Sequence, residues 1–391
     1  MILRNSRNDS IPRLSQMSLP PFYTMEMMKF AAELESSGQP VYHLEVGQPI
    51  APTPAPVLEE AARALRECQL NYCSALGIFS LRQAIAQHYQ YAYDLHINPD
   101  CVVITPGSSL GLYIALLMNF DKGDKIAVAS PSYPCYRNVI HALGYSTIEI
   151  DTYPEKKYLI SPEKLEEYKD ISGILIASPN NPTGSMYDTK ELKALSSYCE
   201  KRGIYMISDE LYHGITYTEK AETVLKFNSK ATIINGFSKY FSMTGWRVGW
   251  IIIPEEDINR YESLLQNVIL CTSTITQIAA IKAFSCYSTL DAQVEMYKQN
   301  LNILYNALRN AGLTKIFKPN GAFYIYLELE NTQLKSMDVC KKLLYEENVA
   351  VAPGMDFSAT EKKCCIRLSF SQNQKVIEHA ATKLNSFIKK L

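Results

Sequence analysis

Three charged side chains of the sequence lie within or directly after apolar stretches, where solvated charges are unusual. Lys239 lies in the segment FSKYFSMTGWRVGW after the run TIIN, and Arg247 follows eight residues later. Asp209 comes directly after the run IYMIS. A charged group at the buried end of a strand is costly unless it is paired. Each residue alone could be a surface or ion-pair side chain, but the three together indicate a binding site.

Small polar residues follow two other apolar runs. CVVIT (101–105) precedes PGSSLGL, in which Gly107, Ser108 and Ser109 open a predicted helix. The free backbone N–H groups and the dipole of a helix start favour a phosphate, although these three residues alone also fit an ordinary capped helix. The run GILIAS precedes PNNPTG, a turn that places Asn181 at the edge of the sheet.

Tyr212, three residues after Asp209, adds an aromatic hydroxyl to this set. An anion cradle, a carboxylate, a tyrosine and a lysine at neighbouring strand ends suggest a phosphorylated cofactor with a basic ring nitrogen and an aldehyde. Pyridoxal phosphate meets each requirement. Lys239 would form a Schiff base, Asp209 would pair with the protonated ring nitrogen, and Arg247 would offer the phosphate a planar fork of donors.

The spacing of these residues indicates the elements that carry them. Asn181, Asp209 and Lys239 are each about 30 residues apart, roughly one helix-plus-strand unit. Continuous apolar runs that alternate with helical stretches indicate a mostly parallel sheet covered on both faces, and ligands bind outside the carboxyl ends of such strands. The predicted strands are CVVIT (101–105), KIAVAS (125–130), GILIAS (173–178), IYMIS (204–208), TIIN (232–235) and VGWIII (248–253).

A change of rhythm near residue 290 predicts a second unit. Long amphipathic segments follow, and then FYIYLEL, VAVAP and CCIRLSF, which are typical of a smaller α+β domain. A helix is expected over 25–37 and a short strand over 41–48, after a mobile tail of about a dozen residues. We therefore predict an α/β fold with an N-terminal arm and helix joining the small domain (1–45), a large pyridoxal-phosphate-binding domain (46–290) and a small C-terminal α+β domain (291–391).

Composition and charge limit the classes of partner. The 391 residues are 47% hydrophobic, and 39 basic against 40 acidic side chains give a formal net charge of -1. This balance gives no reason to expect binding to nucleic acid or to an anionic membrane, so a small molecule is the expected partner. No apolar run could span a membrane and no signal peptide is evident, so a cytoplasmic location is expected. The ten cysteines lack metal-binding spacing, which predicts reduced thiols and no metal site.

The sequence resembles the class I/II pyridoxal-phosphate-dependent aminotransferases of fold type I, which include aspartate, aromatic and alanine aminotransferases. The resemblance covers nearly the whole chain, and its motifs occur in the family's order and spacing. It implies ping-pong transfer of an amino group from an L-amino acid to a 2-oxo acid, with pyridoxal 5'-phosphate as cofactor. The matching motifs are VGQP, NYCSALGIFSLRQAIA, TPGSSLGL, PSYPCY, SPNNPTG, ISDELY, NGFSKYFSMTGWRVGW, NGAFY and IRLSF.

The resemblance also implies a role for each matching residue around the cofactor ring. Lys239 would bind the cofactor covalently and then move the proton between the substrate Cα and the cofactor. Asp209 would hold the ring nitrogen protonated. Tyr212 and Asn181 would contact the 3-oxygen of the ring, and Tyr133 would stack on the ring.

Binding of phosphate and substrate is implied in the same way. Arg367 in IRLSF would bind the substrate α-carboxylate bidentately, close to Gly47 and Asn181. Gly236 departs from relatives that carry serine or threonine there, so the phosphate would have one fewer side-chain ligand. Tyr72 would reach the phosphate of a neighbouring subunit, which implies a homodimer with shared active sites. The other implied phosphate ligands are Gly107, Ser108, Ser109, Ser238 and Arg247.

Substrate choice and reaction type stay open at this point. Segments 17–22 and 266–273 lack the cations with which some subgroups bind a dicarboxylate, so aspartate-, aromatic- and alanine-type substrates are alternatives. A lyase or cyclising enzyme that uses the same cofactor is a second hypothesis. A ligand-sensing regulator is a third, and it would need an N-terminal DNA-binding module, whereas only about 40 residues precede VGQP, without a basic helix-turn-helix pattern.

Overall fold

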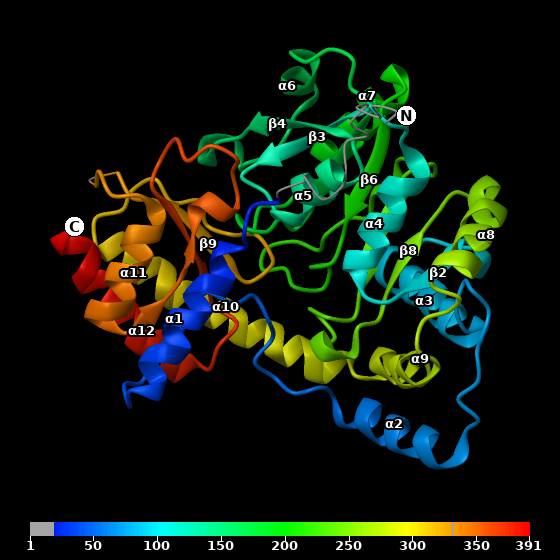
Figure 1. The fold of residues 1–391 in the computed structure, drawn as a ribbon, viewed down its shortest axis with the longest axis horizontal. Coiled ribbons are helices and arrows are strands. Elements are labelled where there is room, and N and C mark those ends of the chain that lie inside the picture. The colour runs from blue at the N-terminus through cyan, green and yellow to red at the C-terminus, as the bar shows by residue number, and fades with distance from the viewer. Residues whose placement is uncertain (1–18, 331) are drawn as a thin grey trace, which may run out of the picture.

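Three β-sheets organise the computed structural model, which describes residues 19–330 and 332–391 (Figure 1). The N-terminal tail that was predicted to be mobile lies outside the described residues. The largest sheet has seven strands in the order β2-β8-β7-β6-β5-β3-β4. Its neighbours pair in parallel except for β8, which is antiparallel to β2 and β7. The prediction of an α/β fold with a mostly parallel sheet is confirmed. Its strands are β2 (Val102–Thr105), β3 (Lys125–Ser130), β4 (Ser146–Asp151), β5 (Gly173–Ala177), β6 (Tyr205–Asp209), β7 (Thr232–Gly236) and β8 (Gly249–Ile252).

Successive side chains of these strands enter two different hydrophobic cores, which explains why the runs are continuously apolar. On β2, Val103 belongs to one core, while Val102 and Ile104 belong to the other. Helices α4, α5 and α8 cover the first face, and α3, α7 and α9 cover the second (Figure 1). These helices are α3 (Phe79–Tyr93), α4 (Ser108–Asn119), α5 (Cys135–Ala142), α7 (Thr189–Arg202), α8 (Ile258–Val268) and α9 (Thr274–Ile281).

All six predicted strands of this sheet occur, but the sheet also contains β4, which was not predicted. β4 lies at the edge and pairs only with β3. Of its sequence STIEID only Ile150 is fully buried. An edge strand with one buried position needs no continuous apolar run, so the pattern used to find the other strands does not detect it.

Local signals set the ends of the helices that flank the sheet. At the start of α7, the Asp188 carboxylate accepts hydrogen bonds from the backbone N–H groups of Lys190 (2.9 Å) and Glu191 (2.8 Å). The Glu191 carboxylate accepts one from the Asp188 N–H (2.9 Å), which completes a capping box. Gly203 ends α7 with a φ of 66°, a left-handed conformation that glycine adopts without steric cost.

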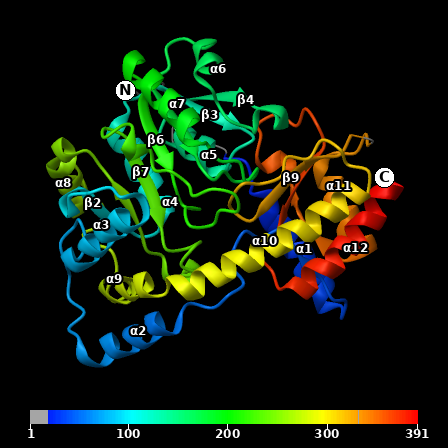
Figure 2. The same ribbon diagram turned by 180° about the vertical axis from the view of Figure 1, so that it is seen from behind.

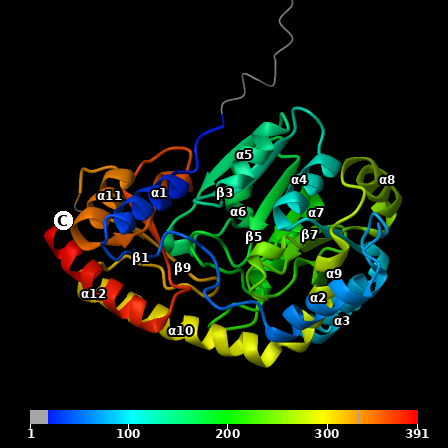
Figure 3. The same ribbon diagram turned by 60° about the horizontal axis from the view of Figure 1, so that its bottom comes forward.

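A second group of elements packs beside the seven-stranded sheet. It contains a three-stranded antiparallel sheet in the order β11-β12-β9 and a parallel pair of β1 with β10. The long helix α10 runs from the seven-stranded sheet to this group (Figure 2), and α1 lies beside α11 (Figure 3). The domain boundaries at residues 45 and 290 stay predictions. The remaining elements are β1 (Tyr42–His43), β9 (Tyr324–Glu328), β10 (Val349–Ala350), β11 (Ala352–Pro353), β12 (Cys365–Ser369), α1 (Tyr23–Ser36), α2 (Ala55–Glu67), α6 (Pro162–Glu166), α10 (Tyr287–Asn310), α11 (Ser336–Glu347) and α12 (Gln374–Lys390).

The strand predicted over 41–48 is wrong in length, because β1 contains only Tyr42 and His43. Beyond it, the backbone carbonyl groups bind side chains instead of a neighbouring strand. The Glu45 carbonyl accepts a hydrogen bond from Arg367, and the Gly47 carbonyl accepts one from Lys239. The apolar and alternating pattern of VYHLEVGQ therefore continues into a loop that faces a cavity.

Three further observations concern the part of the chain that the structure describes. No helix in this part has the length and apolar character that crossing a membrane requires. Within residues 19–330 and 332–391, no group of three or more His, Cys, Asp or Glu side chains could hold a metal ion. All ten cysteines lie in the described ranges, and each is a free thiol.

Candidate active site

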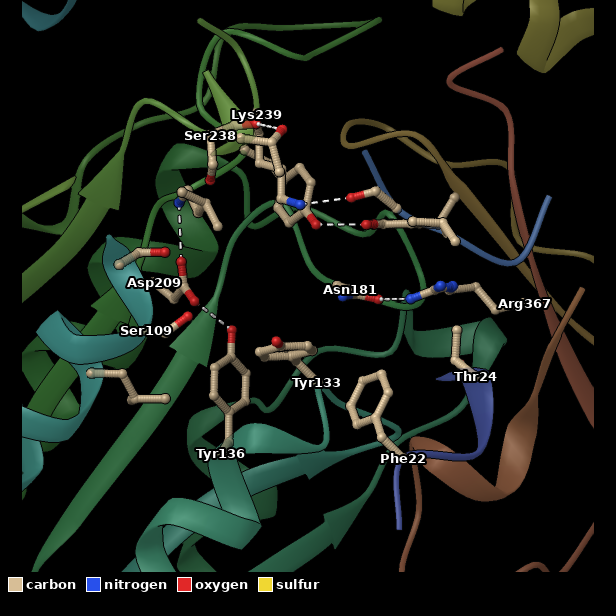
Figure 4. Close-up of a pocket in the computed structure, with 18 of the residues that line it drawn as sticks. Phe22, Thr24, Ser109, Tyr133, Tyr136, Asn181, Asp209, Ser238, Lys239 and Arg367 are labelled. Atoms are coloured by element: carbon tan, nitrogen blue, oxygen red, sulfur yellow. Dashed lines mark hydrogen bonds between the residues drawn. The ribbon is translucent and has the colours of Figure 1, made fainter. Parts of the chain in front are cut away.

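A cavity of about 270 Å³ lies at the carboxyl ends of β5, β6 and β7, where they face β12 and the start of α1 (Figure 4). Its walls come from segments that are far apart in the sequence, as expected for a ligand site at the edge of a parallel sheet. Most of the predicted site residues line it, namely Gly47, Ser108, Ser109, Tyr133, Asn181, Asp209, Tyr212, Ser238, Lys239, Arg247 and Arg367.

Lys239 projects into the cavity from the segment that follows β7. Its Nζ donates a hydrogen bond to the Gly47 carbonyl (2.6 Å). Burial and the positive charges of Arg367 and Arg247 lower the pKa of the Lys239 amine to about 8, against the opposing charge of Asp209. An amine with this pKa is partly neutral near pH 8, so it can act as a nucleophile or as a base.

Asp209 is the last residue of β6, and its half-buried carboxylate lies in the wall of the cavity. Its Oδ2 accepts a hydrogen bond from the Tyr136 hydroxyl (2.7 Å), and its Oδ1 accepts one from the Leu211 N–H (3.0 Å). Burial raises the pKa of Asp209, whereas these two hydrogen bonds and the charge of Lys239 oppose that rise. The carboxylate is thus positioned to pair with a cationic group inside the cavity.

Tyr136 is a site residue that the sequence reasoning missed. It lies on α5, in the same PSYPCY motif that supplied Tyr133, and the two rings meet edge to face with centroids 5.5 Å apart. Tyr136 follows Tyr133 by three residues, and its backbone N–H donates to the Tyr133 carbonyl (3.0 Å). This spacing could have suggested that both rings lie on the same side of the chain. Its hydroxyl orients the Asp209 carboxylate from below, as Figure 4 shows.

Arg367 enters the cavity from β12 on the side opposite Asp209 (Figure 4). Its Nη1 donates to the Asn181 side-chain oxygen (3.0 Å) and its Nη2 to the Glu45 carbonyl. The buried Nε of Arg367 has no hydrogen-bond partner among the described residues. A buried guanidinium with an unused donor suits a carboxylate ligand, which it can bind through more than one hydrogen bond.

Tyr324 on β9 is a second residue that the sequence did not indicate individually, although the motif NGAFY contains it. Its hydroxyl and that of Tyr212 are joined by a hydrogen bond of 2.7 Å, and its ring lies 4.5 Å from the Arg367 guanidinium carbon. A Cβ atom at Gly47 would collide with the Tyr324 hydroxyl. Glycine at position 47 therefore allows the loop after β1 to approach both tyrosine and lysine.

The start of α4 and Arg247 form a cradle at the other end of the cavity. Gly107 precedes the helix with a φ of 80° and no side-chain cap, and Ser108 and Ser109 form its first turn. A Cβ atom at Gly107 would collide with the Arg247 guanidinium. Ser238, buried beside Lys239, completes the predicted set. Free backbone N–H groups, hydroxyls and a guanidinium at a helix start favour a phosphate.

Two residues that the sequence analysis discussed, Gly236 and Tyr72, do not line the cavity. Gly236 faces Gly249 across the β7–β8 pair, where a side chain would crowd the Gly249 backbone at 3.2 Å, so close strand pairing explains the glycine. Tyr72 lies outside the cavity, between α2 and α3, and its side chain is 83% exposed. Its predicted role needs a second chain and stays a prediction.

Comparison with known proteins decides the family. The sequence profile described as "Aminotransferase class I and II" matches residues 39–384. The chain belongs to the class I and II aminotransferases. It is 39% identical over 375 residues to a valine--pyruvate aminotransferase of Mycobacterium tuberculosis, covering 95% of this chain and 97% of that protein. It is 34% identical over 375 residues to an aspartate aminotransferase of Thermotoga maritima, with the same coverage of 95% and 97%.

Solved structures agree with this assignment. The crystal structure of an aminotransferase from Mycobacterium tuberculosis matches with a TM-score of 0.93 at 37% identity, covering 98% of this chain and 100% of that one. Aspartate aminotransferase from Thermus thermophilus with maleate matches with a TM-score of 0.89 at 28% identity, over 97% and 99% of the two chains. The predicted resemblance and fold type are confirmed, and this aminotransferase is an enzyme that transfers amino groups with pyridoxal phosphate.

The residues of the cavity fit this cofactor. The cradle at Gly107 and Arg247 matches its phosphate, and the Asp209 carboxylate matches a protonated ring nitrogen. Lys239 offers an amine of lowered pKa for its aldehyde. The unused donor of Arg367 stays available for a substrate carboxylate.

The contact between Gly107 and Arg247 predicts a loss of cofactor affinity in Gly107→Ala. The added methyl group displaces the guanidinium, and a hydrogen bond to a charged group contributes about 1.5–3 kcal/mol, so the affinity for pyridoxal phosphate falls roughly tenfold to a hundredfold. Titration of the cofactor-free protein with pyridoxal phosphate measures it. Gly144→Ala is the control, because Gly144 has a similar positive φ of 84° and a Cβ there meets no atom within 4 Å. Equal affinities of the two variants would contradict the cradle.

The environment of Lys239 predicts how reconstitution depends on pH. Only the neutral amine attacks an aldehyde, so the rate at which the cofactor-free protein recombines with pyridoxal phosphate rises with a midpoint near pH 8. Arg367→Gln removes a cation that lowers this pKa, so its midpoint moves to higher pH. Stopped-flow absorbance at a series of pH values measures the shift. Arg260→Gln on α8 is the control, and a midpoint that is unchanged in Arg367→Gln would refute the assigned cause.

Proposed function

We propose that the enzyme moves the amino group of a neutral, aliphatic L-amino acid to a small 2-oxo acid. The observation that carries this proposal is the apolar lining of the cavity at the start of α1, where Phe22, Met25 and Met28 face it together with Val46. Apolar walls favour an apolar substrate side chain by burying its surface. The name of the Mycobacterium tuberculosis relative, a valine--pyruvate aminotransferase, supports the same class.

The charges of the cavity argue against a dicarboxylate substrate. Among the described residues that line it, the basic side chains are Lys239, Arg247 and Arg367, and each has a proposed task with the cofactor or with the substrate α-carboxylate. Segment 266–273 offers no further cation. A second carboxylate of the substrate would enter an apolar wall without a partner, which is costly.

The chain's own residues divide the work of binding. Arg247 and the start of α4 would hold the phosphate, assisted by Ser238. Asp209, oriented by the Tyr136 hydroxyl at 2.7 Å, would keep the ring nitrogen protonated. Tyr133 would lie against the ring, and the other proposed contacts to it come from Tyr212 and Asn181.

Arg367 and Lys239 would act on the amino acid itself. Arg367 would bind the α-carboxylate through its free Nε and an Nη group. This contact would orient the substrate so that its Cα–H bond faces Lys239. The bound cofactor supplies an electron-accepting ring that stabilises the charge left when this bond breaks. Lys239 would accept the proton from Cα at its Nζ and return it, a role that its lowered pKa favours.

We also propose a homodimer in which Tyr72 serves the partner's active site. Tyr72 lies in an exposed apolar patch, which we define as Leu70, Tyr72, Val268 and Leu270. A hydrogen bond from the Thr274 hydroxyl to the Asn71 carbonyl (2.7 Å) joins the segment of Tyr72 to the start of α9, four residues after Leu270. A contiguous exposed apolar patch is typical of a protein–protein contact. The free thiols fit a reducing compartment, so we propose a cytoplasmic location.

Single amino acids added to the purified holoenzyme test the substrate class. We expect L-valine and L-alanine to convert the bound cofactor to its aminated form, as followed by absorbance, and a 2-oxo acid to reverse the change. L-aspartate is expected to react at least about tenfold less efficiently, because its second carboxylate stays unpaired. Comparable values of kcat/KM for aspartate and valine would refute the proposal.

Lys239→Ala is the control for this experiment, and it should abolish the spectral change with every amino acid. Product analysis separates transamination from elimination. Accumulation of ammonia together with a 2-oxo acid, while the cofactor spectrum stays unchanged, would point to lyase chemistry instead.

Mixed dimers test whether Tyr72 acts across the subunit contact. A Lys239→Ala chain paired with a Tyr72→Ala chain has one site with both residues intact, because that site takes Lys239 from one chain and Tyr72 from the other. A random equal mixture should therefore recover about one quarter of wild-type activity, since half of its dimers are mixed. Co-expression with two affinity tags and a kinetic assay measures it. Mixed dimers that are no more active than the separate variants would exclude a shared site.

A further inference from the structure

The start of α1, from its N-cap residue Phe22 to its second turn, forms the wall against which a substrate side chain would lie. Phe22, Met25 and Met28 line the cavity, and the Phe22 ring meets the Tyr133 ring nearly edge to face, with centroids 6.4 Å apart. Figure 4 shows Phe22 and Thr24 on the Arg367 side of the cavity. The position of this segment therefore sets the space that is available next to Arg367.

A single carboxylate holds the first turn of α1. Asp356, in the short 3-10 helix Gly354–Asp356 before β12, accepts hydrogen bonds from the Tyr23 N–H (2.8 Å) and the Thr24 N–H (2.7 Å). It accepts a third from the Thr24 hydroxyl (2.6 Å). Phe22, at the N-cap position of α1, supplies no side-chain cap. Asp356 thus takes over the capping of the helix, with its negative charge at the positive end of the helix dipole.

Asp356 is itself fixed on its other side. It is 2% exposed, and its backbone carbonyl accepts a hydrogen bond from Arg137 Nη2 of α5 (2.6 Å). The next residue, Phe357, accepts a backbone hydrogen bond from Ser132 (2.9 Å) and packs its ring 4.9 Å from the Arg367 guanidinium carbon. One short segment therefore joins the turn of α1, the loop before Tyr133 and the side chain of Arg367.

We infer that Asp356 is a positioning residue for substrate selection, which fixes the apolar wall of α1 relative to Arg367 through its hydrogen bonds to Tyr23 and Thr24. It does not touch the proposed position of the substrate and acts through Phe22, Met25 and Met28. The inference rests on the proposed function, because it assigns these three side chains to the substrate's side-chain site. Loss of the anchor should affect a substrate that reaches the wall more than one that does not.

Asp356→Asn tests this inference in the full-length holoenzyme. The amide keeps the size of the side chain but loses its charge and one acceptor oxygen, so α1 is held less firmly. L-valine reaches the wall and the methyl group of L-alanine reaches it less. We expect kcat/KM for valine to fall about tenfold relative to that for alanine, mainly through KM, since small changes in an apolar pocket are worth roughly tenfold or more.

Thr24 supplies a second pair of variants that does not alter Asp356. Thr24→Val removes the hydroxyl that bonds to Asp356 and should change the valine-to-alanine ratio in the same direction, whereas Thr24→Ser keeps the hydroxyl and should keep the ratio. Asp338→Asn is the matched control, because Asp338 is an exposed acidic residue in the first turn of α11. Amide hydrogen exchange adds a readout without turnover, and it should be faster over 23–28 in Asp356→Asn than in Asp338→Asn.

The outcomes distinguish this inference from the proposed function. A wild-type enzyme that converts neither valine nor alanine would overturn the proposed function and the inference with it. A selective wild-type enzyme whose ratio is unchanged in both Asp356→Asn and Thr24→Val would overturn the inference alone, and so would an equal loss for both substrates. If Asp356→Asn fails to fold, the comparison of Thr24→Val with Thr24→Ser decides.

Discussion

The amine of Lys239, a half-buried residue, lies near two guanidinium groups, those of Arg367 and Arg247. In the proposed roles one guanidinium faces the substrate carboxylate and the other the phosphate, so neither can be removed to relieve the repulsion. The Gly47 carbonyl holds the amine without neutralising it. Burial lowers the pKa of the lysine most, and the two groups with proposed binding tasks lower it further. The surrounding fold therefore has to keep three cationic groups close together.

The seven-stranded sheet meets this demand through the order of its strands. Adjacent strands β5, β6 and β7 end beside one another, and they deliver Asn181, Asp209 and Lys239 to one edge. The antiparallel return of β8 then brings the backbone of Gly249 against Gly236 and against the start of α4, where a side chain would not fit. The shape of the proposed phosphate end of the cavity therefore depends on close strand pairing as well as on the side chains that line it.

Local patterns were sufficient to predict six of the seven strands of the large sheet and the polar residues at their ends, because both depend on burial along a short stretch of chain. The edge strand β4 was missed because only one of its residues is fully buried. The strand predicted over 41–48 was too long. The residues after β1 form a loop whose carbonyl groups bind side chains from distant elements, and the sequence pattern does not reveal this. Tyr324 could not be singled out, since its contact with Tyr212 depends on how two sheets pack together. The role of Asp356 could not be predicted from local apolar patterns either, because its hydrogen-bond partners Tyr23 and Thr24 lie more than 330 residues away in the sequence.

Helix α1 is the first helix of the residues that the structure describes, yet the carboxylate that anchors it lies more than 330 residues later in the sequence. Its first turn bonds to Asp356, and β1, which follows it, pairs with β10. Helix α1, whose buried face includes Met27 and Ala31, packs against α11, β10, β11 and the 3-10 helix Gly354–Asp356, and all of these elements follow residue 335. The wall that is proposed to select the substrate thus depends on segments that are made long after α1, so a nascent chain whose large sheet has already folded still lacks the anchor of that wall.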